Sequence, residues 1–195
     1  MKKFMLASVG AILCLYVAAQ ENVIKPLTIK DTVPDIIFSN LYNHPAKTIR
    51  LSDFKGKLVI LDFWAAWCGG CVYKLSALDS LQQRYAAKLQ IISVNCTKRT
   101  KDTPEKIAAL LRQWQQANGK TFSPLVVADS SSLFKKMFPH RSIPHYVWIS
   151  PEGTVAAITG SEELTEQNIN ALLKGQSPPL PLKNDFLPQP TTNAQ

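Results

Sequence analysis

Two cysteines separated by two residues form the most reactive pattern in this chain. Cys68 and Cys71 lie in the stretch DFWAAWCGGC, residues 62–71, directly after an apolar run. A CxxC pair can hold half of a zinc site, close a small structural disulfide, or exchange electrons with the disulfides of other proteins. A structural bridge over so short a loop stabilises a fold little, and neither a second CxxC nor a spaced pair of histidines completes a zinc site. The residues therefore favour redox exchange and leave metal binding as an alternative.

The N-terminal segment predicts export, which sets the context of the cysteines. Lys2 and Lys3 precede an uncharged apolar run over residues 4–19 that ends in Val-Ala-Ala, a pattern typical of a secretory signal over residues 1–19. This run is shorter than the roughly 20 residues of a comfortable bilayer span, so a retained membrane anchor is the alternative. Disulfides persist outside the cytoplasm, and we expect a periplasmic or otherwise extracytoplasmic protein.

The remaining charge and composition indicate an ordinary globular domain. The formal net charge of +8 falls by two when Lys2 and Lys3 are removed with the signal. The charges are spread along the chain without a block of five or six of one sign, which favours a solvated basic surface over nucleic-acid binding. A chain of 195 residues that is 46% hydrophobic can build a sizeable core. We expect a monomer.

Strands and helices alternate along the chain and must position the two sulfurs. The runs at 57–63 and 89–95 are almost continuously apolar, as strands buried on both faces of a parallel sheet are. Apolar residues recur at steps of three and four from residue 71 to 89, which predicts an amphipathic helix with the sulfurs at its first turn. Thr103 as a cap and Pro104 at the first position predict a helix over 104–118. Further strands are expected at 125–128, 146–149 and 154–159, further helices at 130–138 and after Thr165, and a hairpin at 36–51.

The composition divides the chain into four parts. After the signal at 1–19 we expect an N-terminal extension at 20–34 and a folded domain at 35–175. Five of the thirteen prolines fall in residues 176–195, beside few apolar side chains. This last part is therefore expected to be a Pro-rich flexible tail without a core of its own.

Several of these segments resemble one family. The motifs VILDFWAAWCGGC and RSIPHYVWISPEGTV, together with the terminal helix, are similar to those of the thioredoxin-like fold, and the added helix at 104–118 resembles the extracytoplasmic TlpA/ResA-like branch. The resemblance covers about residues 35–175. It implies an α/β thioredoxin-like fold, with a central mixed β-sheet flanked by helices, an N-terminal hairpin and one inserted helix. Two residues depart from the family pattern: Gly70 replaces the usual proline, and Lys74 stands where a glutamate is common.

The resemblance implies an exported thiol-disulfide oxidoreductase. Its substrates would be proteins with disulfides, an upstream membrane or periplasmic thiol would supply electrons, and no cofactor beyond the Cys68–Cys71 pair would be needed. Cys68 lies where a helix N-terminus lowers a thiol pKa. It is expected to attack the partner's disulfide, and Cys71 is expected to resolve the mixed disulfide.

The direction of electron flow is set by how strongly the thiolate is stabilised. The Gly-Gly pair between the sulfurs supplies no charge for this, which favours a reductant over an oxidant. Lys74 acts in the opposite sense.

Asp62 is the most informative residue outside the cysteines. It interrupts a strand expected to be apolar on both faces, where an unpartnered polar group costs on the order of 2 to 7 kcal/mol. The resemblance implies that this carboxylate takes the proton from Cys71. Burial should raise the pKa of Asp62 and suit it to act as a general base.

A second segment is expected to complete the site. The resemblance implies a cis bond between Ile143 and Pro144 that faces the CxxC, with the backbone of Ile143 free to pair with an extended substrate. Trp64 and Trp67 both suit a packing role, and Trp67, directly before Cys68, is the better candidate for a surface that faces the substrate. His145 has two open roles: packing, or a positive charge near Cys68.

One more cysteine and two alternative functions of the protein need a prediction. Cys96 is expected to be a small buried hydrophobe rather than a third redox cysteine. A copper or zinc chaperone would carry stoichiometric metal after purification. A noncatalytic thioredoxin-like adaptor would reduce no disulfide.

Overall fold

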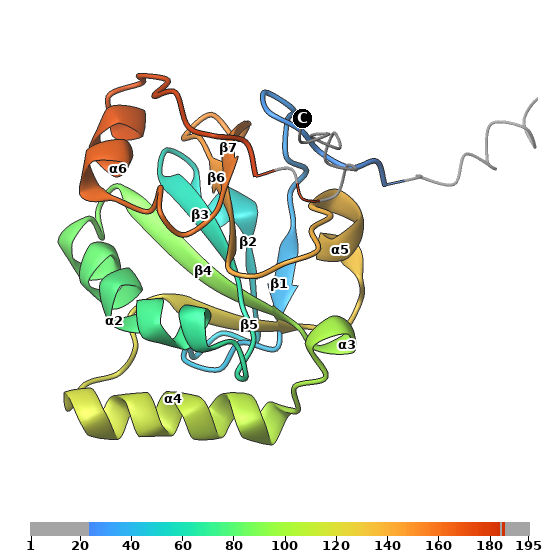
Figure 1. The fold of residues 1–195 in the computed structure, drawn as a ribbon, viewed down its shortest axis with the longest axis vertical. Helices are drawn as coiled ribbons and strands as arrows, with labels where there is room; N and C mark the ends of the chain where they lie inside the picture. Colours follow the sequence, from blue (N-terminus) through green and yellow to red (C-terminus); the bar gives the residue numbers. More distant parts are fainter. Residues whose placement is uncertain (1–23, 184, 186–195) are drawn as a thin grey trace, which may run out of the picture.

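A five-stranded mixed sheet forms the centre of the molecule (Figure 1). The computed structural model describes residues 24–183 and residue 185. In the sheet the strands follow the order β5-β4-β3-β6-β7, with β3, β4 and β5 parallel to one another and β6 and β7 antiparallel to their neighbours. The five strands are β3 (Leu58–Phe63), β4 (Leu89–Cys96), β5 (Leu125–Asp129), β6 (His145–Ile149) and β7 (Val155–Thr159).

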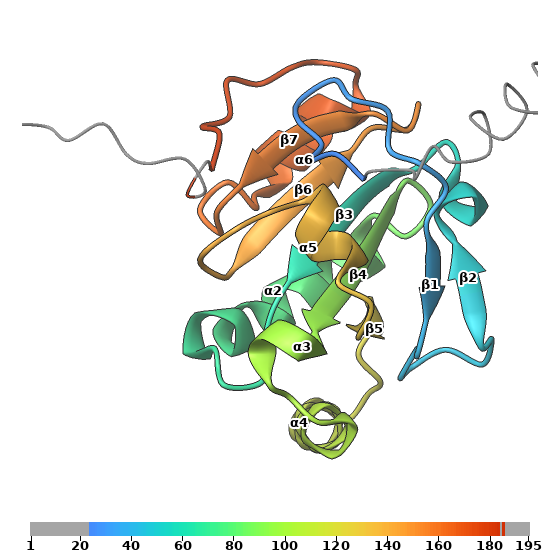
Figure 2. The ribbon, with the colours of Figure 1, turned by 90° about the vertical axis from the view of Figure 1, so that its right-hand side faces the viewer.

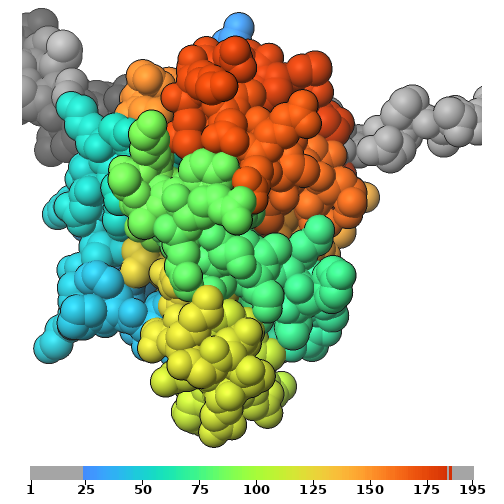
Figure 3. Space-filling model, turned by 90° about the vertical axis from the view of Figure 1, so that its left-hand side faces the viewer, coloured from blue at the N-terminus to red at the C-terminus, as the bar shows by residue number. Residues whose placement is uncertain are grey.

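Helices and a hairpin cover the two faces of this sheet. One face carries α2 (Gly69–Arg84), α4 (Pro104–Asn118) and α6 (Glu166–Leu173), which Figure 3 shows as one continuous surface in green, yellow and red. The other face carries α5 (Leu133–Met137) and the hairpin of β1 (Ile37–Ser39) and β2 (Thr48–Arg50), seen from the side in Figure 2. Two short helices complete the chain, η1 (Leu51–Phe54) and α3 (Thr97–Thr100). The expected fold class is confirmed.

The central strand β3 is buried on both faces, as its sequence predicts. Alternation along the strand sends Leu58 and Ile60 into the core beneath α2, α4 and α6, and Val59, Leu61 and Phe63 into the core beneath α5 and the hairpin. Each of these side chains is at most 3% exposed. A strand packed this way fixes the position of the loop that follows it.

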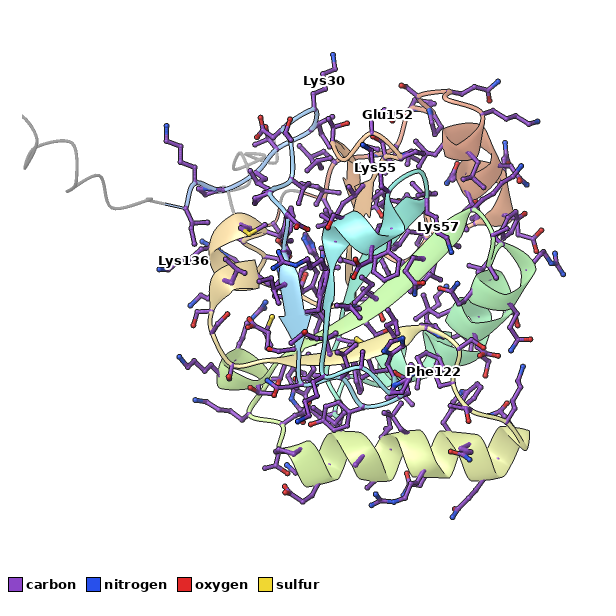
Figure 4. All side chains as sticks on the ribbon, turned by 180° about the vertical axis from the view of Figure 1, so that it is seen from behind. Lys30, Lys55, Lys57, Phe122, Lys136 and Glu152 are labelled. Atoms are coloured by element: carbon purple, nitrogen blue, oxygen red, sulfur yellow. A yellow bond between two sulfur atoms is a disulfide. The ribbon has the colours of Figure 1, made fainter. Side chains whose placement is uncertain are left out.

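The inserted helix α4 has the expected bounds. The Thr103 hydroxyl accepts a hydrogen bond from the backbone N–H of Lys106 (3.4 Å), and Pro104 occupies the first turn. The helix ends at Gly119, whose φ of +67° suits a residue without a side chain. Its inner face is held by contacts such as that of Trp114 with Phe122, whose ring centroids are 5.1 Å apart. Figure 4 labels Phe122 between α4 and the sheet.

The hairpin predicted at residues 36–51 is present and lies along the β5 edge of the sheet. Leu41 forms a bridge with Val127, and the backbone N–H of Tyr42 donates to the carbonyl of Val126 (3.0 Å). The edge strand β5 is thereby covered. The two short helices, η1 and α3, were not predicted.

The structure describes part of the C-terminal segment but not the predicted signal. The signal predicted for residues 1–19 lies outside the described residues. Among the residues that are described, no helix is long and apolar enough to cross a membrane. Part of the Pro-rich segment contacts the domain: Leu180 packs against the core beneath α6, and the backbone N–H of Lys183 donates to the carbonyl of Ile158 in β7 (2.8 Å).

Candidate active site

The two sulfurs lie at the N-terminus of α2, directly after the buried strand β3. Cys68 is the N-cap residue of this helix of 16 residues, and its Sγ accepts a hydrogen bond from the backbone N–H of Cys71 (3.2 Å). The two cysteines form a disulfide. Cys68 is 8% exposed and Cys71 is 2% exposed. The backbone N–H of Cys71 in the first turn therefore points at the more accessible sulfur, where it and the helix dipole would stabilise a thiolate.

Hydrogen bonds from the segment after β4 hold the loop that carries Cys68. The carboxylate Oδ2 of Asp102 accepts from the backbone N–H of Ala66 (2.7 Å) and from the side-chain amide of Asn95 (2.8 Å). The indole N–H of Trp67 donates to the carbonyl of Thr100 (2.7 Å). Sequence reasoning missed Asp102, because it precedes the cap of α4 in a short polar stretch that fits no motif.

The two glycines between the sulfurs are surrounded by free space. A Cβ added at Gly69 would meet no atom within 4 Å outside its own helix turn. One added at Gly70 would lie 3.9 Å from Cδ of Pro144, an ordinary van der Waals contact. Packing therefore does not require glycine at either position.

The loop before β6 faces the sulfurs. The bond between Ile143 and Pro144 is cis, which confirms the prediction. The carbonyl oxygen of Ile143 lies 3.9 Å from Sγ of Cys68. The backbone next to the proline is thus close enough to align a peptide whose sulfur is bonded to Cys68.

Asp62 is buried in β3, with 1% of its surface exposed. One carboxylate oxygen accepts a hydrogen bond from the Ser93 hydroxyl (2.9 Å), and the other has no partner among the described residues. Burial raises the pKa of Asp62 to about 7, although the hydroxyls of Ser93 and of Tyr146, its neighbour on β6, oppose the shift. By alternation along β3, Asp62 shares the face of Ile60 and Trp64, which is the face covered by α2 and Cys71. The carboxyl group therefore lies in the same half of the core as the second sulfur, and it titrates near neutral pH.

The two tryptophans differ in exposure as expected. Trp64 is 1% exposed and packs in the core, whereas Trp67 is 65% exposed beside Cys68. Next to Trp67 is a cavity of about 320 Å³ between α3 and the loop before β6. Its lining includes the apolar side chains of Phe63, Val94 and Ile143, with Arg99 and Arg141 among the polar ones.

His140 and His145 do not bring positive charge to the site. The rings of His140 and His145 stack with centroids 4.4 Å apart. Burial lowers the pKa of His140 to about 4 and that of His145 to about 2, so both rings are neutral at physiological pH. Packing is thus the role that the structure supports for His145. No group of three potential metal ligands occurs within the described part of the chain.

Comparisons with known proteins show which family the chain resembles in sequence. The family model AhpC/TSA matches residues 29–158. The thioredoxin-like protein YneN of Bacillus subtilis is 47% identical over 76 residues, which are 39% of this chain and 42% of YneN. The thiol-disulfide oxidoreductase ResA of Geobacillus kaustophilus is 29% identical over 154 residues, 78% of this chain and 80% of ResA.

Solved structures share the fold. A putative thiol:disulfide interchange protein DsbE from Chlorobium tepidum superposes with a TM-score of 0.61 at 25% identity, over 75% of this chain and 99% of that one. The pneumococcal exposed lipoprotein thioredoxin Etrx1 from Streptococcus pneumoniae gives a TM-score of 0.57 at 26% identity, over 73% of this chain and 99% of that one.

Proposed function

This chain belongs to the AhpC/TSA family of thioredoxin-like proteins, and we propose that it is a thiol-disulfide oxidoreductase that reduces disulfides of other proteins through Cys68 and Cys71. One observation carries the proposal. The two cysteines form a disulfide at the N-terminus of α2, and the more accessible sulfur lies 3.9 Å from the carbonyl of Ile143 in the loop before β6. This arrangement combines an activated sulfur with a backbone that can hold a peptide.

The reaction transfers two electrons from the cysteine pair to the substrate. The Cys68 thiolate attacks one sulfur of the substrate disulfide, that S–S bond breaks, and the other substrate sulfur leaves and takes up a proton. The thiol of Cys71 then loses its proton to the Asp62 carboxylate and attacks Sγ of Cys68. The mixed disulfide breaks, the second substrate sulfur leaves as a thiolate that takes up a proton, and Asp62 returns its proton to the solvent. The Cys68–Cys71 disulfide remains to be reduced by an upstream thiol donor.

The substrate side of the site comprises Trp67, Ile143 and Pro144. The exposed indole of Trp67 offers an apolar surface beside the sulfur. Backbone groups of Ile143 would pair with an extended segment of the substrate, a mode that accepts many sequences. The substrates are accordingly proteins with accessible disulfides.

The direction proposed is reduction, and the compartment is extracytoplasmic. Gly69 and Gly70 bring no charge to the thiolate of Cys68, and burial keeps the pKa values of His140 and His145 too low for either ring to do so. A thiolate stabilised mainly by the helix N-terminus gives a less oxidising pair. Export rests on the sequence of residues 1–19.

Trapping of mixed disulfides tests the proposal. The Cys71→Ser variant should accumulate disulfide-linked complexes with other proteins in cells, because nothing resolves the bond at Cys68. The Cys68→Ser variant should accumulate none, and Cys96→Ser serves as the matched control. Nonreducing gels give the result. Equal trapping by both CxxC variants, or a purified wild type that fails to catalyse insulin reduction by dithiothreitol, would contradict it.

A further inference from the structure

The segment after α6 returns across the sheet edge to the loop before β6. It passes over β7, where the backbone N–H of Lys183 bonds to the carbonyl of Ile158 (2.8 Å). Leu180 contacts the core on the way. The segment therefore brings two charged side chains, Lys183 and Asp185, to the loop that faces the sulfurs.

Lys183 bonds to the backbone on both sides of Ile143. Its Nζ donates to the carbonyl oxygen of Ser142 and to that of Pro144, each at 2.8 Å. Only 17% of the Lys183 side chain is exposed. One ammonium group thus joins the two carbonyls that flank Ile143 in the chain.

The carboxylate of Asp185 accepts hydrogen bonds from the same loop. Its carboxylate accepts from the backbone N–H of Ser142 (2.9 Å), from the Ser142 hydroxyl (2.6 Å) and from the backbone N–H of Arg141 (3.2 Å). The same carboxylate lies 3.6 Å from Nζ of Lys183. Although burial opposes it, these bonds hold the pKa of Asp185 below its usual range, so the carboxylate is ionised at neutral pH.

The contacts leave the polar groups of Ile143 itself available. Within the described residues the N–H of Ile143 donates no hydrogen bond, and its carbonyl oxygen has only Sγ of Cys68 near it. Lys183 and Asp185 contact the neighbouring backbone groups and not these two. The groups that would pair with a substrate are therefore free on a loop that is fixed from outside.

We propose that Lys183 and Asp185 are positioning residues for substrate binding, and this inference rests on the proposed function. They hold the backbone on either side of Ile143, so that a peptide disulfide meets an ordered loop instead of ordering it on binding. Ordering a loop on binding weakens affinity. Their effect should appear in the binding of peptide substrates and not in the chemistry of the sulfurs.

The test compares two disulfides that differ in their need for the loop. Insulin presents a peptide backbone to Ile143, whereas bis(2-hydroxyethyl) disulfide has none. Lys183→Met and Asp185→Asn should each raise the KM for insulin about five- to tenfold with little change in kcat. The rate with the small disulfide and the redox potential of the Cys68–Cys71 pair should stay unchanged. Lys183→Arg, which keeps the donor, should restore much of the affinity.

Two exposed residues supply matched controls, Lys174→Met and Glu152→Gln, since their side chains make no hydrogen bond or ion pair among the described residues. An unchanged KM for insulin in the Lys183 and Asp185 variants would overturn the inference, and so would equal losses on both disulfides. A wild type inactive on both disulfides would instead refute the proposed function.

Discussion

The loops that follow the parallel strands β3 and β4 each carry a cysteine at a helix N-cap. The two cysteines differ in the length of the helix that they cap and in the groups around the sulfur. Cys68 follows β3 and caps the 16 residues of α2, and its Sγ accepts a backbone hydrogen bond from that helix. Cys96 ends β4 and caps the four residues of α3, without a hydrogen bond from its side chain. A cap position alone therefore does not activate a sulfur.

The surroundings of the two sulfurs explain the difference. Burial raises the pKa of Cys96 to about 12, and the nearby carboxylate of Asp129 acts in the same sense. At pH 7 the thiolate fraction of such a group is on the order of 10⁻⁵. Cys68 has the 16 residues of α2 behind it and directly follows the exposed Trp67. The two cysteines are almost equally exposed, at 8% and 7%, so the length of the helix and the neighbouring groups, not exposure, distinguish Cys68 from Cys96.

The loop after β4 nevertheless forms hydrogen bonds that hold the loop after β3 in place. Asp102 holds the N–H of Ala66, and the Thr100 carbonyl holds the indole of Trp67. One loop carries the proposed chemistry and the other holds it in place.

Replacing each cysteine by serine should give the largest difference between the loops. Cys68→Ser removes the attacking sulfur, and catalysed insulin reduction should fall at least about 1,000-fold. Cys96→Ser should keep its rate within about twofold, because a buried thiol of high pKa does not take part. Insulin turbidity assays measure both rates. A comparable loss in the Cys96 variant would end the distinction.

Asp62→Asn should separate catalysis from stability. The folded-state pKa of Asp62, about 7, lies above that of an unfolded aspartate, about 3.9. The wild type therefore loses stability as pH rises from about 4 through 7, by on the order of 4 kcal/mol. The variant should be more stable than the wild type above pH 7 and nearly equal to it near pH 4. Melting curves across this range, with Glu152→Gln as control, measure the difference.

The same variant should reduce disulfides more slowly near neutral pH. Asparagine cannot accept the proton of Cys71, so the rate should fall about tenfold or more and recover in part at alkaline pH, where Cys71 ionises unaided. Rates that match the wild type from pH 6 to 9 would eliminate the general-base role. A wild-type stability that does not change between pH 4 and 7 would mean that the pKa of Asp62 is not raised in the folded state.

Asp102→Ala should destabilise the loop after β4 and its contact with the Cys68 loop, while both sulfurs stay in place. Its loss leaves the N–H of Ala66 and the amide of Asn95 without this acceptor, and the free energy of unfolding should drop by about 2 to 3 kcal/mol. Urea unfolding measures it, and Lys101→Ala, at an exposed neighbouring position, is the control. A drop equal to that of the control would mean that the bond to Ala66 contributes nothing.

Trp67→Phe should have the smallest effect. It removes the indole N–H bond to Thr100 but keeps an aromatic surface beside Cys68, so we expect a loss of about 0.5 to 1 kcal/mol in unfolding. The KM for insulin should change by less than about threefold. A larger effect than that of Asp102→Ala would reverse the ranking of the two contacts between the loops.

Strong local patterns made most of the fold predictable from the sequence. The apolar runs of β3 and β4 and the cap and stop signals of α4 fixed those elements to within a residue or two. The four-residue helices η1 and α3 are too short to show a period. The contrast between Trp64 and Trp67, and the burial of Cys96, also followed the expectations.

Parts of the site depend on contacts between distant residues, which composition and spacing do not encode. The bond from Ala66 to Asp102 spans 36 positions, and the bonds from Lys183 to Ser142 and Pro144 span 41 and 39. A lysine and an aspartate in a Pro-rich stretch look like ordinary solvated charges until the fold brings them to the loop. Similarly, the stacking of His140 on His145 needs the sheet to place them.

The space around Gly69 and Gly70 has an evolutionary consequence. Because an added Cβ meets nothing at the first position and only an ordinary contact at the second, both sites can accept new residues while the core stays as it is. Residues there lie beside the sulfurs, where a charged or aromatic side chain alters the reduction potential of the Cys68–Cys71 pair. A lineage could therefore drift between donor and acceptor chemistry through two solvent-facing substitutions, with the rest of the scaffold inherited unchanged.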